Sequence, residues 1–138
     1  MNLSEIEYCR SVVIPANIVS AGNIKPNWSF TINNLGFIPD YAILTSVHSI
    51  TDVATNYQFA IQCNDFYPEP FISIACADLS YNVQTVIPLK KPIQTLNFQI
   101  SEVQTDNSLA PINPLGTSTS TPWWISLTFD FVKLKNKK

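Results

Sequence analysis

Apolar and polar residues alternate along the closing segment of the chain. The apolar positions all fall at odd sequence numbers, and they are Trp123, Ile125, Leu127, Phe129 and Phe131. Ser126, Thr128 and Asp130 lie between them. Successive side chains of a strand point to opposite faces, so this pattern predicts a central strand with one buried and one wet face. Val132 and Leu134 break the alternation, which predicts a bulge or an exit from the sheet.

Seven further segments have strand-like patterns, bounded by turn signals. They are residues 10–21, 27–33, 40–50, 56–63, 70–77, 81–89 and 92–101. No segment of ten or more residues has the apolar spacing of a helix, and residues 4–9 are the best candidate for a short helical turn. Eight short strands predict an all-β fold, an antiparallel eight-stranded β-sandwich, and eight is the strand count of a jelly roll. At 138 residues we expect a single domain, residues 1–138.

Composition adds that the surface carries little charge. Charged residues make up 13% of the chain, about half the usual share of roughly 25%. Ser, Thr, Asn and Gln take the wet positions instead. A surface of this kind repels copies of itself weakly, which suits a protein packed against neighbours. A secreted β-domain with a neutral polar surface is the alternative interpretation.

The formal net charge of −2 gives no global case for nucleic-acid binding. The basic residues are nevertheless concentrated in a C-terminal tail, residues 133–138, which holds Lys133, Lys135, Lys137 and Lys138. Such a tail is most often a solvated terminus. Its functional interpretation is attraction to an anionic surface, either lipid headgroups or packaged nucleic acid.

Three cysteines form no metal-ligand spacing. Cys63 and Cys76 each follow an isoleucine two positions earlier, so we expect both to be buried and reduced. The N-terminal residues lack the apolar run of a signal peptide, and no stretch approaches about 18 apolar residues. A reducing compartment is the simplest expectation, although one disulfide stays open as an alternative.

Candidate catalytic groups are few. The single histidine, His48, lies in an apolar-rich strand, where we expect it on the same face as Leu44 and Ile50. Asp65 and Glu69 flank Pro68 and are more typical of solvated turn acids than of a catalytic pair. No motif of a hydrolase, nucleotide-binding or zinc site occurs. We therefore expect no enzymatic activity, no cofactor, no metal and no small-molecule substrate.

One connection, the loop 102–122, is unusually long for a compact domain. Loops of this length are usually functional or mobile, and this one should project from one end of the sandwich. Its candidate interface residues are Asp106, Asn107, Pro111 and Asn113.

Trp124 should point outward from the closing strand, beside Ser126 and Thr128. It could cover a sheet face, anchor a subunit contact as tryptophans often do, or stack on a sugar ring. We take it as a further candidate interface residue.

The last two strands carry a resemblance to a known class of proteins. The segment LNFQISEVQTDNSLAPINPLGTSTSTPWWISLTFDFVK resembles the C-terminal strand–loop–strand of small single jelly-roll capsid proteins from icosahedral viruses, and LGFIPDYAILTSVHSI is similar to the strand before their middle hairpins. The likeness covers about a third of the chain at the level of motifs. The loop 102–122 is longer than that pattern predicts.

This resemblance implies a viral structural protein, a capsid vertex (penton) or minor capsid subunit. It implies self-assembly, with a homopentamer as the expected oligomer, contacts with a major capsid protein, and a place in the virion after assembly inside the host cell. The basic tail would then face an internal membrane or the packaged genome. A carbohydrate-binding, lectin-like β-sandwich module is the alternative.

Overall fold

The computed structural model describes residues 5–20, 23–50, 58–75, 79–104, 106–111 and 123–135. Within these ranges the chain forms ten strands and almost no helix. The strands are β1 (Ile6–Ser20), β2 (Asn23–Ile24), β3 (Asn27–Thr31), β4 (Tyr41–Ile50), β5 (Gln58–Cys63), β6 (Tyr67–Ala75), β7 (Leu79–Pro88), β8 (Thr95–Val103), β9 (Leu109–Pro111) and β10 (Trp123–Leu134). Eight of them correspond to the predicted strands; β2 and β9 are short additions.

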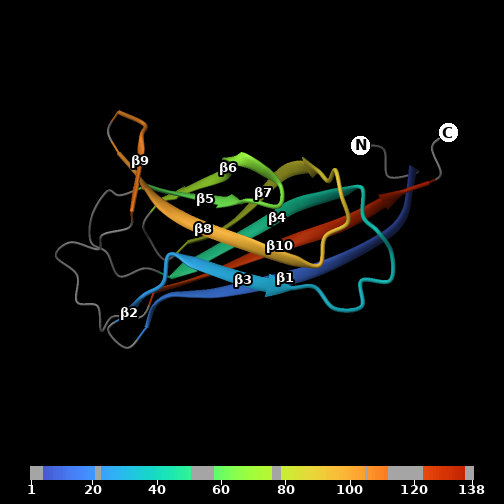
Figure 1. Ribbon diagram of the computed structural model, residues 1–138, viewed down its shortest axis with the longest axis horizontal. Helices are drawn as coiled ribbons and strands as arrows, with labels where there is room; N and C mark the ends of the chain where they lie inside the picture. The colour runs from blue at the N-terminus through green and yellow to red at the C-terminus, as the bar shows by residue number, and fades with distance from the viewer. Residues whose placement is uncertain are drawn as a thin grey trace.

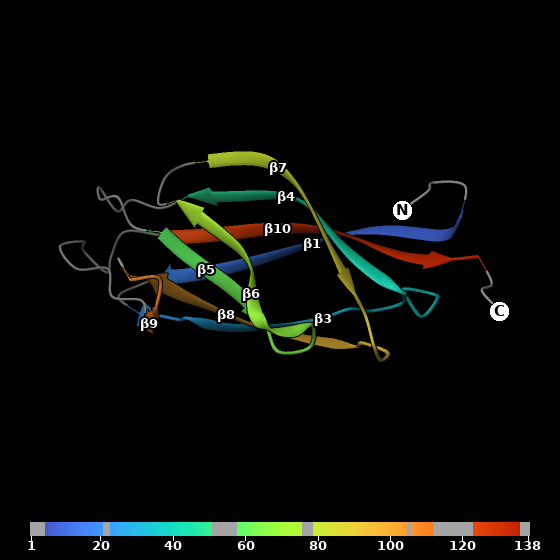
Figure 2. The same cartoon turned by 90° about the horizontal axis from the view of Figure 1, so that it is seen from above.

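Two antiparallel sheets face each other as a sandwich-like arrangement (Figures 1 and 2). Sheet A has the order β2-β1-β10-β4-β7. Sheet B has the order β3-β8-β5-β6, and β9 also pairs with β8. The all-β, antiparallel part of the fold prediction is therefore confirmed. The closing strand β10 lies between β1 and β4, in the interior of sheet A, as its pattern predicted.

Phenylalanine rings fill the space between the sheets. Phe129 of β10 lies within 5.7–6.3 Å, between ring centroids, of three rings from sheet B and its turns: Phe66, Phe71 and Phe98. Tilted and edge-to-face contacts of this kind add to the free energy gained by burying the rings. Ile125, Leu127, Phe129 and Phe131 are all buried, as the alternation predicted. The side chain of Trp123 lies outside the described part.

The inner face of sheet B also follows the sequence pattern. Leu96, Phe98 and Ile100 of β8 are buried, whereas Asn97 between them is exposed. Cys63 of β5 is fully buried and is not in a disulfide, as expected. Cys76 lies outside the described residues.

The helical turn predicted for residues 4–9 is not formed by Ile6–Cys9, which belong to β1. Cys9 pairs with Val132 of β10, so this segment gains a full ladder of hydrogen bonds from its neighbour. A single isolated turn has no such support. Ser4, the first residue of the predicted turn, lies outside the described residues.

A bulge in β4 overturns the expected position of His48. Phe129 pairs with Leu44 and Thr128 pairs with Ser46, which leaves Thr45 as an extra residue in β4. One extra residue reverses the faces that follow it. Leu44 is therefore buried between the sheets, whereas His48 lies on the outer face of sheet A.

The irregularity predicted at Val132 lies in the neighbouring strand β1 rather than in β10. β10 stays paired with β1 through Lys133, and the register shift falls between Ile6 and Tyr8. Val132 lies on the outer face of sheet A, yet it is only 1% exposed. Ile6, Cys9 and Ile43 line a groove with it, so aliphatic neighbours bury this position from outside the sandwich.

The segment 102–122 contains more regular structure than its sequence predicted. Residues 102 and 103 continue β8, and Leu109–Pro111 form β9, which folds back on β8. Residues 112–122 lie outside the described part. The β8–β9 hairpin projects at the end of the sandwich that also holds β2, on the left of Figure 1.

Candidate functional site

Trp124 lies at the start of β10, on the outer face of sheet A. It pairs with Asn17 of β1 and Ile50 of β4. Its side chain is half-buried, and its ring meets His48 edge to face with centroids 4.9 Å apart. The outward direction of Trp124 is as predicted. The ring is therefore neither fully packed nor fully exposed.

Of the predicted interface residues in the long loop, Asp106 and Asn107 lie in a tight turn. Asp106 accepts hydrogen bonds from the Ser108 backbone (3.0 Å) and hydroxyl (2.6 Å), and these bonds lower the pKa of the Asp106 carboxyl. Asn107 has a φ of 67°, a left-handed conformation that asparagine tolerates. Pro111 pairs with Ser101 in the β8–β9 ladder. Asn113 lies outside the described residues.

These candidates share one end of the sandwich but not one sheet. Trp124 belongs to sheet A, whereas Asp106 and Asn107 extend from β8 of sheet B (Figure 1). Their conformations have local causes, since Asp106 forms the turn and Asn107 supplies its positive φ. Among the described candidates, Trp124 is the one whose partial exposure has no such local cause.

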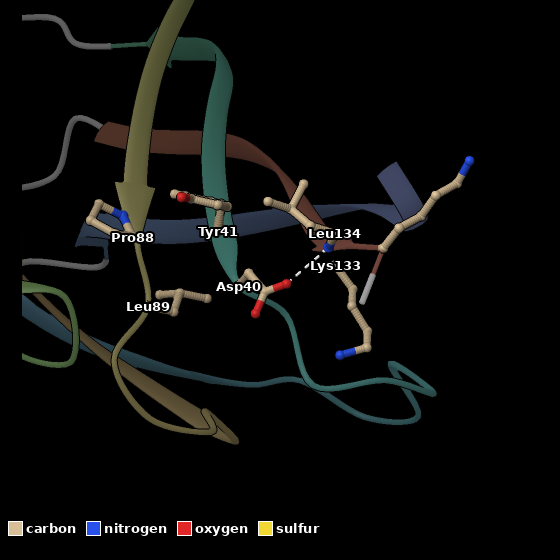
Figure 3. Close-up of a pocket in the computed structure, with 7 residues that line it drawn as sticks. Asp40, Tyr41, Pro88, Leu89, Lys133 and Leu134 are labelled. Carbon is tan, nitrogen blue, oxygen red and sulfur yellow. Dashed lines mark hydrogen bonds between the residues drawn. The ribbon is translucent and has the colours of Figure 1, made fainter. Parts of the chain in front are cut away.

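The two described lysines of the C-terminal tail lie at the opposite end. Lys133 and Lys135 line a pocket of about 360 Å³ with Asp40, Tyr41, Pro88, Leu89 and Leu134 (Figure 3). The last residues of β10 form one wall, and the ends of β4 and β7 form the others. Lys137 and Lys138 lie outside the described part.

Asp40 fixes the shape of this pocket. Its carboxylate accepts a hydrogen bond of 2.8 Å from the Leu134 backbone, as Figure 3 shows. Its own N–H donates to the Val132 carbonyl, and its carbonyl accepts from the Leu89 N–H. A single residue thus ties the ends of β4, β7 and β10 together, and holds Lys133 and Lys135 in place.

Two further lysines reach the same end, and sequence reasoning missed them. Lys90 and Lys91 directly follow Leu89 in the turn after β7, and both are exposed. Four of the five lysines in the described ranges therefore gather here, and we call Lys90, Lys91, Lys133 and Lys135 the basic end. The only signal for these residues in the sequence was that the two lysines are adjacent. Their position beside the end of β10 depends on the strand topology, which the sequence pattern does not give.

The outer faces of the two sheets differ in chemistry. Sheet B presents neutral polar side chains that bond to one another across strands. They are Ser29 with Asn97 (2.7 Å), Thr31 with Thr95 (3.2 Å) and Gln62 with Gln99 (3.2 Å). Cross-strand pairs of this kind stabilise a wet sheet face. The outer face of sheet B therefore has its polar groups satisfied internally.

Sheet A presents aliphatic side chains instead. Val13 of β1 is 55% exposed and Val86 of β7 is 43% exposed. The same sheet also carries a groove of about 270 Å³, lined by Ile6, Cys9, Ile43, Thr45, Val83, Gln84, Asp130 and Val132. Its one acid, Asp130, accepts a hydrogen bond from the Ser11 hydroxyl. This face is the more suitable of the two for packing against another surface.

Of the two acids considered for catalysis, Asp65 has structural partners. Asp65 accepts a hydrogen bond of 2.8 Å from the Asn97 backbone and lies 3.7 Å from the Cys63 sulfur. It thus ties the β5–β6 turn to β8, while Glu69 is exposed on β6. Within the described ranges, His, Cys, Asp and Glu side chains form no group of three or more suited to a metal ion.

No helix among the described residues has the length and apolar character needed to cross a membrane. The sequence matches no protein-family model and no curated protein.

Proposed function

We propose that the chain is a structural subunit of an icosahedral virus capsid, at a vertex (penton) or minor capsid position. In this proposal it acts by assembly rather than catalysis. Its partners are copies of itself, in a homopentamer, and a neighbouring major capsid protein. Its fold is an eight-stranded jelly roll, and its place is the virion.

The pairing of the eight long strands carries this proposal. In chain order, the first pairs with the last, the second with the seventh, the third with the sixth, and the fourth with the fifth: β1 with β10, β3 with β8, β4 with β7, and β5 with β6. A long antiparallel ribbon rolled into two sheets has this order, and jelly rolls of viral capsids and lectins are built this way. The resemblance of β8 and β10 to capsid strands adds to the argument.

Surface chemistry supports assembly within that fold. A fold shared by many functions does not identify one, so the choice rests on the site. The exposed valines Val13 and Val86 and the half-buried Trp124 all lie on the outer face of sheet A. Aliphatic and tryptophan side chains on a charge-poor face are suited to the core of a subunit contact.

The proposal is tested by measuring the mass of the purified protein by light scattering over a range of concentrations, together with electron microscopy of the particles. We expect a closed ring, with five subunits as the expected number. A protein that stays monomeric at the highest soluble concentration would refute self-assembly.

Replacing Trp124, the proposed anchor of the subunit contact, tests that contact directly. Trp124→Ala should shift the equilibrium toward monomer, because a truncated tryptophan at an interface typically costs 2 kcal/mol or more, roughly a 30-fold change in affinity. Ser73→Ala, at an exposed position on β6, is the matched control and should assemble normally. Equal assembly of both variants would place the contact elsewhere.

One observation favours the carbohydrate-binding alternative. A groove of about 270 Å³ on sheet B contains the amides of Gln62 and Gln99 beside Pro26 and the exposed Leu109. Amides next to an apolar surface are suited to sugar hydroxyls and ring faces. Glycan binding that is lost in Gln99→Ala, measured on a monomeric protein, would establish this function in place of assembly.

A further inference from the structure

Exposed apolar side chains lie beside the lysines of the basic end. Ile38, in the connection between β3 and β4, is 60% exposed, the highest value among the large hydrophobic residues of the described ranges. Tyr8 is 51% exposed and stacks on Phe37, with ring centroids 5.5 Å apart. Tyr8 is also the β-ladder partner of Lys133. One end of the sandwich thus combines an aliphatic side chain, two aromatic rings and four lysines.

Positive charge is unevenly distributed along the sandwich. The basic end also contains acids: Asp40 lines the pocket with Lys133 and Lys135, and the Glu5 carbonyl accepts a hydrogen bond from the Lys135 N–H. The carboxylate of Asp40 accepts a hydrogen bond from the Leu134 backbone. The opposite end carries Glu102 and Asp106 against Lys25 alone among the described residues. The basic end is therefore the side that an anionic surface attracts.

We propose that the basic end docks on an anionic lipid bilayer. Ile38 and Tyr8 enter the headgroup region, while Lys90, Lys91, Lys133 and Lys135 contact lipid phosphates. The pocket between Lys133, Lys135 and Leu89, at about 360 Å³, has room for a headgroup phosphate. Lysines bury their aliphatic stems and keep the ammonium group at the interface, so both kinds of contact can form together.

The aliphatic side chain favours lipid over nucleic acid. Nucleic acids are bound through phosphates and through bases that stack on flat rings. An exposed isoleucine beside lysines matches interfacial membrane binding more directly, because apolar burial and lysine contacts act together there. The inference goes beyond the proposed assembly function, and a monomeric subunit could also bind in this way.

Vesicle co-sedimentation of the full-length protein tests the inference. Phosphatidylcholine vesicles with phosphatidylserine are compared with vesicles of phosphatidylcholine alone. We expect binding to the anionic vesicles that weakens as salt is raised. Lys90→Gln together with Lys91→Gln should lower the partition coefficient roughly 30-fold, the effect of removing two lysines near an anionic membrane. Ile38→Ser should lower it about tenfold at every salt concentration.

The opposite end of the molecule supplies matched controls. Lys25→Gln removes a lysine and Leu109→Ser removes an apolar side chain that is 44% exposed; both should bind vesicles like the unaltered protein. Equal loss in test and control variants would overturn the docking surface, as would equal binding to both vesicle types. Binding to a single-stranded oligonucleotide but not to vesicles would assign the basic end to nucleic acid instead. Light scattering of the same samples reports self-assembly separately.

Discussion

Phe98 of sheet B and Phe129 of sheet A meet across the sandwich, with ring centroids 6.3 Å apart. Phe129 is fully buried and also contacts Phe66, Phe71 and Phe131. The two sheets are therefore joined at their centre by aromatic packing. The closing strand supplies the ring at the middle of it.

Phe129→Ala should lower the free energy of unfolding by about 3–5 kcal/mol, because it leaves a cavity that the surrounding rings fill only partly. Denaturant unfolding measures this change. Thr128→Ala, on the other face of the same strand, is the control and should stay within about 0.5 kcal/mol of the unaltered protein. Comparable losses in both variants would contradict the assigned faces of β10.

Asp40→Ala should destabilise the fold by about 1 kcal/mol, since it removes the acceptor for the Leu134 N–H. Asp40→Asn keeps a carbonyl oxygen at that position and should lose less. Hydrogen exchange of the Leu134 amide is the specific readout, and it should accelerate more in Asp40→Ala than in Asp40→Asn. An unchanged exchange rate in Asp40→Ala would exclude the proposed role of this carboxylate.

The two described cysteines should differ in reactivity. Burial raises the pKa of Cys63 to about 12, so its thiol is protonated and shielded, whereas Cys9 is exposed. Alkylation under native conditions should modify Cys9 quickly and Cys63 slowly, as mass spectrometry of peptides would show. Burial, and then the charge of Asp130, raise the pKa of Cys9. Asp130→Asn should therefore lower this pKa, increase the thiolate fraction and speed modification of Cys9.

Cys63 also predicts a pH dependence of stability. Its folded pKa lies above the ordinary value of 9.0, so the folded state holds a proton that the unfolded state releases at alkaline pH. The contribution to stability is complete below pH 9.0 and falls as pH rises toward about 12. The stability advantage of the unaltered protein over Cys63→Ala should shrink across this interval in urea titrations. A constant difference would show that the thiol does not titrate differently on folding.

Asn107→Gly should be tolerated, because glycine adopts the φ of 67° without strain. Asn107→Val should cost about 1–2 kcal/mol in the turn, since a β-branched residue avoids that conformation. Thermal melts measure both. Unchanged assembly of Asn107→Gly would assign this residue to the turn, and a specific loss of assembly would restore it as an interface residue.

Alternation along the chain was sufficient to predict the long strands and their inner faces, because burial of one sheet face leaves a period of two in the sequence. It could not predict the bulge at Thr45, since an extra residue leaves no mark in a strand that is apolar on both faces. The expected face of His48 was wrong for that reason. The short strands β2 and β9 have too few residues to show a period.

The outward direction of Trp124 could be predicted from the same alternation. The basic end could be predicted only in part. Lys133 and Lys135 are neighbours in the sequence, so their grouping was predictable. Lys90, Lys91, Tyr8 and Ile38 come from three other segments and meet them only through strand pairing. Sequence patterns report which face a residue occupies, but the neighbours on that face depend on topology.

The position of β10 between β1 and β4 has a consequence for how the protein is made. β1 is synthesised before the other nine strands, and its main hydrogen-bonding partner, β10, is synthesised after them. Sheet A therefore lacks an interior strand until β10 has been synthesised, and the edges of β1 and β4 that pair with it stay open until then. Pairing across so many residues forms slowly, and unpaired edges invite aggregation. We expect the nascent chain to depend on chaperones, and a chain cut short before β10 to be insoluble rather than partly active.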